Sequence, residues 1–189
     1  MIDIVKFREC HEDKREIGRF SDEDLDKYKN KLSNEVIDFL KQEGKCTYSH
    51  SFFWTILPED YHEILDQWGL DGYSCYAFLR SSFGSIVFYK GSDFFSLNPY
   101  DGTLSEFSDL FRLVINNYLQ SSSILEITFW FELHQKNIDI LPVLKEDEIY
   151  ALDPTIPEGG SPETSKIVVA KLKEHLQKLA DLFDHTTTE

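Results

Sequence analysis

A succession of four short apolar segments in the middle of the chain restricts its fold most strongly. Turns at Gly84, at Gly91 and over Asn98–Gly102 separate them. Segments this short and rich in aromatic and β-branched residues are typical of strands, and such brief connections leave no room for crossover helices. We therefore expect an antiparallel meander of Tyr73–Leu79, Ser85–Tyr89, Phe94–Leu97 and Thr103–Phe107. Alternation in the first segment predicts one shared face for Tyr73, Cys75, Ala77 and Leu79.

Two helices are expected before the meander. Ser21 offers a capping hydroxyl, and the carboxylates that follow it suit the positive end of a helix dipole. This pattern predicts a helix that ends near Asn30. Ser33 or Asn34 is suited to cap a second helix, whose apolar residues are spaced for one buried face. Gly44 is a natural C-terminal stop for that helix.

Two further strands are predicted, at Ile2–Phe7 and at Ser51–Ile56. The second of them is short, aromatic and β-branched, as strands are. Pro58, followed by two acidic residues, predicts the first turn of a helix. The apolar side chains of that helix recur at helical spacing and indicate a core stripe, formed by Tyr61, Ile64, Leu65 and Trp68.

The second half of the chain is expected to be mainly helical. Apolar residues mark one helix within 110–118 and another over Ile124–His134, although the latter sequence also fits a strand. Asp153–Gly160 is a loop rich in proline and glycine. A final helix is predicted to start near Ser161 or Pro162, with an apolar face of Ile167, Leu172, Leu176, Leu179 and Leu182.

These elements predict an α+β fold in which a central antiparallel β-meander is flanked by N-terminal and C-terminal helices. The length of 189 residues fits one domain. No internal repeat and no low-complexity linker divides the sequence. We therefore expect a single domain over residues 1–189.

The charge balance restricts the partners. The formal net charge is −15, from 34 acidic and 19 basic residues. Such a surface repels nucleic acid and anionic membranes, because both bind proteins through lysine and arginine. The same surface attracts a basic partner, while plain solubility is the simpler use of the charge. We expect a protein partner, no direct nucleic acid and no membrane.

Cysteine use and hydropathy indicate the compartment. Cys10, Cys46 and Cys75 are few and scattered, which is typical of a reducing environment rather than a disulfide framework. The first residues lack the apolar core of a secretion signal, and no stretch reaches the about 18 apolar residues of a membrane span. We therefore expect a cytoplasmic protein.

Residue patterns that would indicate chemistry are weak. Cys10-His11 and the Cys46/His50 pair lack a second pair at zinc-finger spacing. Neither a nucleophile elbow nor a phosphate-binding loop is present. We predict no catalytic residue, no cofactor and no metal, and hence no enzyme. An enzyme of unrecognised class is the alternative, with a pocket near the glycine-rich loop and His175.

Several motifs between about residue 20 and residue 183 carry a family resemblance. They are the helix ending at Gly44, the stretch SFFWTILPEDY at 51–61 with Ile64–Trp68, the Phe83-Gly84 step, Asp147–Tyr150, Pro157–Gly160, and the pairs His175-Leu176 and Leu179-Ala180. In this order they resemble the GAD-like/DUF1851 family. The resemblance implies a GAD-like part over about residues 1–107 and a DUF1851-like helical part over about 108–185. Leu40, Leu57 and Leu152–Pro154 depart from the family's pattern and mark a divergent member.

Members of that family include immunity proteins of bacterial type VI secretion systems, which neutralise a cognate toxin, notably a DNase. The resemblance thus implies an immunity protein whose partner is a basic nuclease effector. Charge and expected exposure predict the partner contacts at Asp22, Glu23, Asp24, Glu146, Asp147, Glu148 and Glu158. A regulatory or scaffold binding module is a further alternative.

Overall fold

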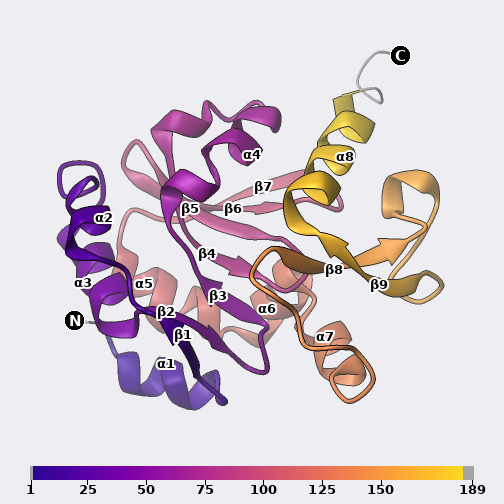
Figure 1. Ribbon diagram of the computed structural model, residues 1–189, viewed down its shortest axis with the longest axis horizontal. Helices are drawn as coiled ribbons and strands as arrows, with labels where there is room; N and C mark the ends of the chain where they lie inside the picture. The colour runs from indigo at the N-terminus through magenta and orange to yellow at the C-terminus, as the bar shows by residue number, and fades with distance from the viewer. Residues whose placement is uncertain (1, 185–189) are drawn as a thin grey trace.

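Seven antiparallel strands form one sheet in which each strand pairs with its neighbour in the chain (Figure 1). The structure is a computed structural model that describes residues 2–184; the other residues of the predicted single domain lie outside this range. The predicted meander and the α+β class are confirmed, and two strands that were not predicted, β1 and β2, extend the sheet. The strands are β1 (Arg15–Gly18), β2 (Lys45–Tyr48), β3 (Phe53–Thr55), β4 (Cys75–Ser81), β5 (Ile86–Lys90), β6 (Asp93–Asn98) and β7 (Thr103–Ser108).

Helices precede and follow this sheet. Within residues 2–184 they are α1 (Ile4–Cys10), α2 (Asp22–Asp26), α3 (Asn34–Glu43), α4 (His62–Gln67), α5 (Phe111–Asn116), α6 (Ser122–Phe129), α7 (Phe131–Asn137) and α8 (Leu172–Asp184). The Ser21 hydroxyl accepts a hydrogen bond from the N–H of Asp24 at 3.1 Å, and Ser33 caps α3 in the same way. Both predicted caps are confirmed, but α2 ends at Asp26 rather than near Asn30.

Each face of the sheet is buried, and the two faces contribute to two separate hydrophobic cores. Successive residues of a strand point to opposite faces, so Phe53 and Val87 enter a core with α1, α3, α5 and α6. Their neighbours Trp54 and Phe88 enter a second core with α4 and α8. The predicted core stripe of the helix after Pro58 belongs to this second core, as Tyr61, Ile64 and Leu65 are buried and Trp68 is half-buried.

The prediction of a strand at Ile2–Phe7 is wrong, because most of this segment lies in helix α1. The Asp3 carboxylate accepts a hydrogen bond from the N–H of Lys6 at 3.1 Å and caps the helix. Ile4 and Phe7, three residues apart, pack into the same core. A helix places both side chains on one face, which a strand does not.

The segment Ile124–His134 is helical, as predicted, but it is divided between α6 and α7. Trp130 between them has a φ of 58°, which is the left-handed conformation and ends the first helix. The Trp130 ring packs against Tyr100, with 4.5 Å between the ring centroids. The break therefore turns an aromatic side chain into the second core.

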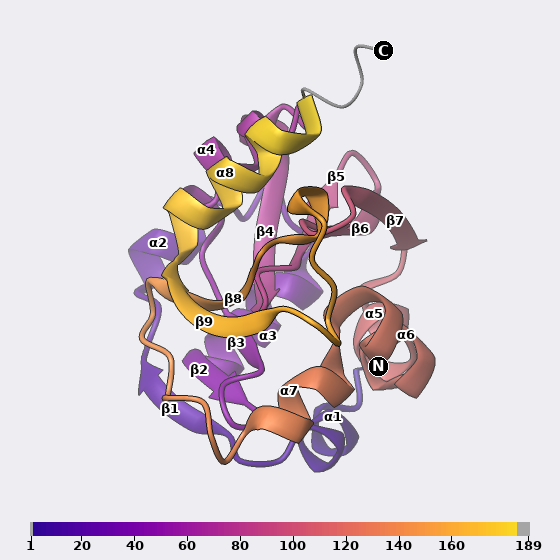
Figure 2. The ribbon, with the colours of Figure 1, turned by 90° about the vertical axis from the view of Figure 1, so that its right-hand side faces the viewer.

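The prediction that the last helix starts near Ser161 or Pro162 is wrong. Lys166–Lys171 forms a strand, β9, that pairs antiparallel with β8 (Glu148–Asp153), and α8 begins only at Leu172. The β-branched run within β9 favours a strand, and pairing with β8 fixes it. Figure 2 shows α8 beside α4, on the side of the molecule where β8 and β9 lie.

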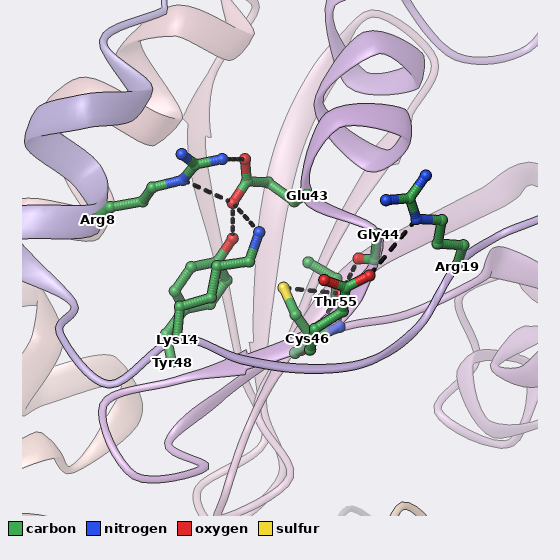
Figure 3. Close-up of polar contacts among 9 residues, drawn as sticks. Arg8, Lys14, Arg19, Glu43, Gly44, Cys46, Tyr48 and Thr55 are labelled. Atoms are coloured by element: carbon green, nitrogen blue, oxygen red, sulfur yellow. Dashed lines mark hydrogen bonds and ion pairs between the residues drawn. The ribbon is translucent and has the colours of Figure 1, made fainter.

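Glu43 at the end of α3 is a buried carboxylate that joins three segments (Figure 3). Arg8 of α1 donates to both of its oxygens, Lys14 lies 3.0 Å away, and the Tyr48 hydroxyl of β2 donates a further hydrogen bond. Burial by itself raises the pKa of Glu43, but these donors outweigh it and hold the pKa below its ordinary value. The carboxylate is therefore charged at neutral pH and fastens α1 and β2 to α3.

We expect Glu43→Gln to lower the free energy of unfolding by about 2–3 kcal/mol at neutral pH, because Arg8 and Lys14 lose their counter-ion. The folded pKa of Glu43 is depressed, so its stabilisation is present above the unfolded pKa and is lost as the pH falls through the folded pKa. Urea unfolding at about pH 7 and about pH 3 measures both effects, and the difference between the two proteins should shrink at the lower pH.

Asp38→Asn is the matched control, since Asp38 is an exposed carboxylate on the same helix. Its unfolding free energy should stay within about 0.5 kcal/mol of the wild type. A loss of stability in Glu43→Gln that is equally large at both pH values would contradict the assigned role of the charge.

Candidate functional site

An open cavity of about 600 Å³ lies where the sheet meets the segments that lead into β8 and α8. We call it the Trp54–Arg80 pocket. Cavities of this size are typical of binding sites. Its lining is mainly apolar, and the apolar side chains come from three separate parts of the chain: Phe20, then Trp54, Ile56, Leu57 and Tyr61, and finally Leu172.

A β-bulge in β4 aims Arg80 at this pocket. The register of β4 against β5 shifts between Ala77 and Leu79, so Phe78 and Leu79 both enter the core beside α3. Arg80 then faces the other side of the sheet, where it lies directly opposite Trp54 of β3. The predicted shared face holds for Cys75 and Ala77 but is wrong for Leu79, which points away from Ala77. It is also wrong for Tyr73, which lies exposed in a 3₁₀ turn before β4.

Arg80 is a buried cation that has no carboxylate partner among the described residues. It is 1% exposed, and its guanidinium lies 4.3 Å from the centroid of the Trp54 ring. It donates hydrogen bonds to the carbonyl oxygens of Ser81, at 3.3 Å, and Glu146, at 2.9 Å. Burial lowers the pKa of Arg80, while Tyr61 and Glu146 act in the opposite direction, and the group stays charged. Arg80 thus holds the segment before β8 against the sheet.

Four lysines at the edge of the pocket are each matched with a carboxylate. Lys45 pairs with Glu146, Lys145 with Glu148 at 3.5 Å, Lys171 with Asp147 at 2.6 Å, and Lys173 with Glu63 at 4.0 Å. These pairs are partly exposed, so each contributes little to stability. Their consequence is electrostatic, because they cancel the positive charge of the lysines at the opening.

Asp60 and Glu174 line the same pocket without an ion-pair partner among the described residues. Both are exposed at the residue level. Burial of its carboxyl raises the pKa of Asp60, and the nearby charges of Lys45 and Lys173 oppose this shift. Asp60 and Glu174 are therefore the carboxylates of the lining without an ion pair among the described residues, while the positive charge of Arg80 is buried and is attracted by Glu146 and Asp147.

The structure distributes the seven predicted partner residues over three places. Asp22, Glu23 and Asp24 form the first turn of α2, immediately after the pocket residue Phe20. Glu146 and Asp147 line the pocket, and Glu148 begins β8 beside them. Glu158 lies in a 3₁₀ turn after β8. Of the seven residues, Glu146 and Asp147 thus line the cavity, the first group follows one of its lining residues along the chain, and Glu158 does not line it.

Most of these carboxylates are already engaged within the chain. Asp22 pairs with Lys41 at 2.7 Å, Asp24 with Lys27 at 3.3 Å, and Glu158 with Lys178 at 2.8 Å. Hydrogen bonds from Lys178 and Thr155 lower the pKa of Glu158 to about 2. Of the seven, Glu23 has no ion-pair partner among the described residues. The predicted set is therefore less available to a partner than its charge suggests.

Two serine–histidine pairs lie at hydrogen-bonding distance, both in the interior. In the first, Ser49 Oγ lies 3.4 Å from Nδ1 of His11, and the second joins Ser82 and His134. Ser82 Oγ lies 3.0 Å from Nδ1 of His134, whose Nε2 lies 3.1 Å from the Ser49 carbonyl oxygen. Both side chains are at most 1% exposed. Burial lowers the pKa of His134 to about 4, so the ring is neutral at pH 7. The pair therefore connects three segments of the chain in the interior.

The residues of the alternative enzyme site are also part of the packing. Nε2 of His175 lies 3.4 Å from the Tyr100 hydroxyl, and burial lowers the pKa of His175 to about 4. Thr155 and Glu158 close the glycine-rich loop with a reciprocal capping box. Within residues 2–184, no group of three His, Cys, Asp or Glu side chains is arranged to hold a metal ion.

Sequence reasoning missed the pocket. It identified Trp54 and Tyr61 as part of a fold signature and assigned no role to Asp60 or Arg80. A signal was present, since Arg80 is the one charged residue in the otherwise apolar or small run CYAFLRSSFG at 75–84. A lone charge in a buried strand indicates a satisfied structural ion or a binding site.

Comparison with known proteins shows the class to which this architecture belongs. Residues 5–98 match the model of the GAD-like domain. This part of the chain, which contributes Trp54, Tyr61 and Arg80 to the pocket, is therefore a member of the GAD-like domain family. The predicted resemblance is confirmed for it, and the DUF1851-like part over about 108–185 stays a prediction.

A solved structure has the same fold. The crystal structure of Atu4351 from Agrobacterium tumefaciens superimposes with a TM-score of 0.69 and 17% sequence identity, over 86% of this chain and 81% of that chain. Identity at this level establishes the likeness of fold. No curated protein matched the sequence. No helix among residues 2–184 is long and apolar enough to cross a membrane.

We expect Arg80→Lys to lower the free energy of unfolding by about 1–2 kcal/mol, because an ammonium group keeps the charge but cannot stack on Trp54 while bonding two carbonyl oxygens. Urea unfolding with Trp fluorescence measures the loss. Arg112→Lys, an exposed change on α5, is the control and should be neutral. Wild-type stability in Arg80→Lys would show that the planar guanidinium does not hold this segment.

Proposed function

We propose that this protein is an immunity protein, a cytoplasmic and non-enzymatic binding protein that neutralises a cognate secreted bacterial toxin. The toxin is a basic nuclease effector of a type VI secretion system. The family resemblance supports the proposal, and one observation carries it. Glu43 is the only buried carboxylate among the described side chains, so nearly all of the net charge of −15 faces solvent.

Such a surface suits a nuclease as partner. Nucleases bind the phosphate backbone through lysine and arginine, which gives them a basic face. A strongly acidic protein attracts that face over a distance and raises the association rate. Once bound, it occupies the charges that would otherwise hold nucleic acid. The same charge keeps the immunity protein itself from binding nucleic acid.

Long-range attraction between charges does not by itself make the dissociation of the complex slow. Ion pairs at an exposed surface contribute little to the free energy of binding. Most of the predicted carboxylates must also give up an ion pair with a lysine of this chain before they can pair with a basic residue of the partner. Stable complexes depend on a few buried anchors in concave, desolvated places. The Trp54–Arg80 pocket is such a place, with mainly apolar walls and a lining that includes four carboxylates as well as lysines.

We expect the tagged protein to co-purify from its native lysate with one basic effector domain, identified by mass spectrometry. The purified domain should then bind with a nanomolar dissociation constant, lose nuclease activity on binding, and bind more weakly as the salt concentration rises. Co-expression should protect cells from that effector.

Glu23→Lys gives a sharper test of the acidic face, because Glu23 has no ion pair to lose among the described residues. We expect the association rate to fall by about two- to threefold and the dissociation rate to change little. Glu106→Lys changes the net charge equally on edge strand β7 and should have a smaller effect. Failure to bind or inhibit any effector, together with failure to protect cells, would refute the proposed function.

A further inference from the structure

The Trp54–Arg80 pocket is large enough to receive a side chain from another protein. Its volume of about 600 Å³ is several times that of a single side chain, and its apolar walls include the half-buried Phe20 and Leu57. Half-buried apolar groups in a cavity gain most from an occupant that completes their burial. The walls therefore favour a long side chain with an apolar stem over a free ion.

The charged residues at the opening favour an occupant with a positive charge. Each of the four rim lysines already has a carboxylate within 4.0 Å, whereas Asp60 and Glu174 have no partner among the described residues. A cation beside either carboxylate would gain a charge-assisted hydrogen bond. An anion there would meet these two carboxylates, and Arg80 is almost closed off from solvent, with its hydrogen bonds to carbonyl oxygens formed.

We infer that this pocket is the anchor site of the complex and that it receives an arginine side chain of the basic partner. The stem packs against Phe20 and Leu57, and the guanidinium head binds the carboxylates of Asp60 and Glu174. The inference rests on the proposed function, and it deepens it by naming the group that is recognised. Arginine suits the site better than lysine, because its planar head has apolar faces and binds two carboxylates at once.

The position of the pocket agrees with this role. Phe20 leads directly into the acidic first turn of α2, and Glu146 and Asp147 form part of the pocket wall. A basic surface drawn to these carboxylates is brought over the opening. The anchor is thus surrounded by charges that guide the encounter but contribute little to its lifetime.

The decisive variant is the double substitution Asp60→Asn and Glu174→Gln, which keeps the shape of both side chains and removes their charge. We expect the purified effector domain to bind it at least about tenfold more weakly than the wild type, mainly through faster dissociation. Glu106→Gln with Asp38→Asn removes the same charge elsewhere and should change affinity by less than about twofold. Thermal unfolding of each variant confirms that it is folded.

A probe that needs no toxin tests the pocket alone. N-acetyl-arginine-methylamide, titrated into the protein, should shift the NMR signal of the Trp54 indole N–H, which is fixed by its bond to the Ser51 carbonyl oxygen at 2.7 Å. The neutral citrulline analogue should cause no shift, and neither should the arginine probe with the double variant. Shifts caused by an acetyl-glutamate probe instead would overturn the inference in favour of an anionic occupant.

The outcomes separate the two proposals. If the wild type binds and inhibits its effector but the double variant binds equally well, the arginine anchor is refuted and the immunity function stands. If no effector is bound, the immunity function fails, and the arginine probe still decides whether the pocket recognises a basic side chain. An unshifted Trp54 signal then refutes the pocket inference as well.

Discussion

Burial of the central sheet on both faces is the constraint on which the rest of this structure depends. A sheet covered on one side needs a single apolar face, but here neighbouring residues such as Phe53 and Trp54 must both be apolar and enter different cores. The chain meets this demand by adding helices to each side. A charged residue inside such a strand has no solvent-facing side to occupy. Arg80 therefore needs a special environment, and the stacking on Trp54 and the carbonyl oxygens of Ser81 and Glu146 supply it.

Local signals in the sequence were sufficient for much of this fold. The glycine turns that separate β4, β5 and β6, and the capping serines before α2 and α3, act within a few residues and were interpreted correctly. Elements that depend on distant partners were missed. Strand β9 exists because it pairs with β8, and its apolar residues also fit a helix. In α1, the cap at Asp3 was a local signal that was overlooked. Composition located the acidic residues but not the lysines that fold against them, because pairs such as Lys171 with Asp147 join residues distant in the sequence.

The candidate site was hidden from the sequence for the same reason. Trp54 and Arg80 become neighbours through the pairing of β3 with β4, and Arg80 reaches that face only because a bulge reverses the alternation after Ala77. A bulge has no signature in this sequence, and the segment Lys145–Asp147 that closes the pocket lies more than 60 residues further along the chain. Prediction of the site from sequence would require the register of the sheet, which periodicity does not provide.

The arrangement of charge separates two properties of a protein complex. The exposed carboxylates act together over a distance, and it matters little for the encounter that most of them are paired with lysines, because the excess of negative charge remains. The time a partner stays bound depends instead on groups that are desolvated in the complex.

In this chain the association rate and the lifetime of the complex depend on different residues. The turn at Asp22–Asp24 lies on the outer surface, whereas Asp60 lines a cavity. A carboxyl group that is costly to bury alone becomes favourable once a cation joins it. The position of Asp60 in the lining of the pocket, where an occupant would take it out of water, is therefore the physical reason to assign specificity to the pocket and not to the acidic turn.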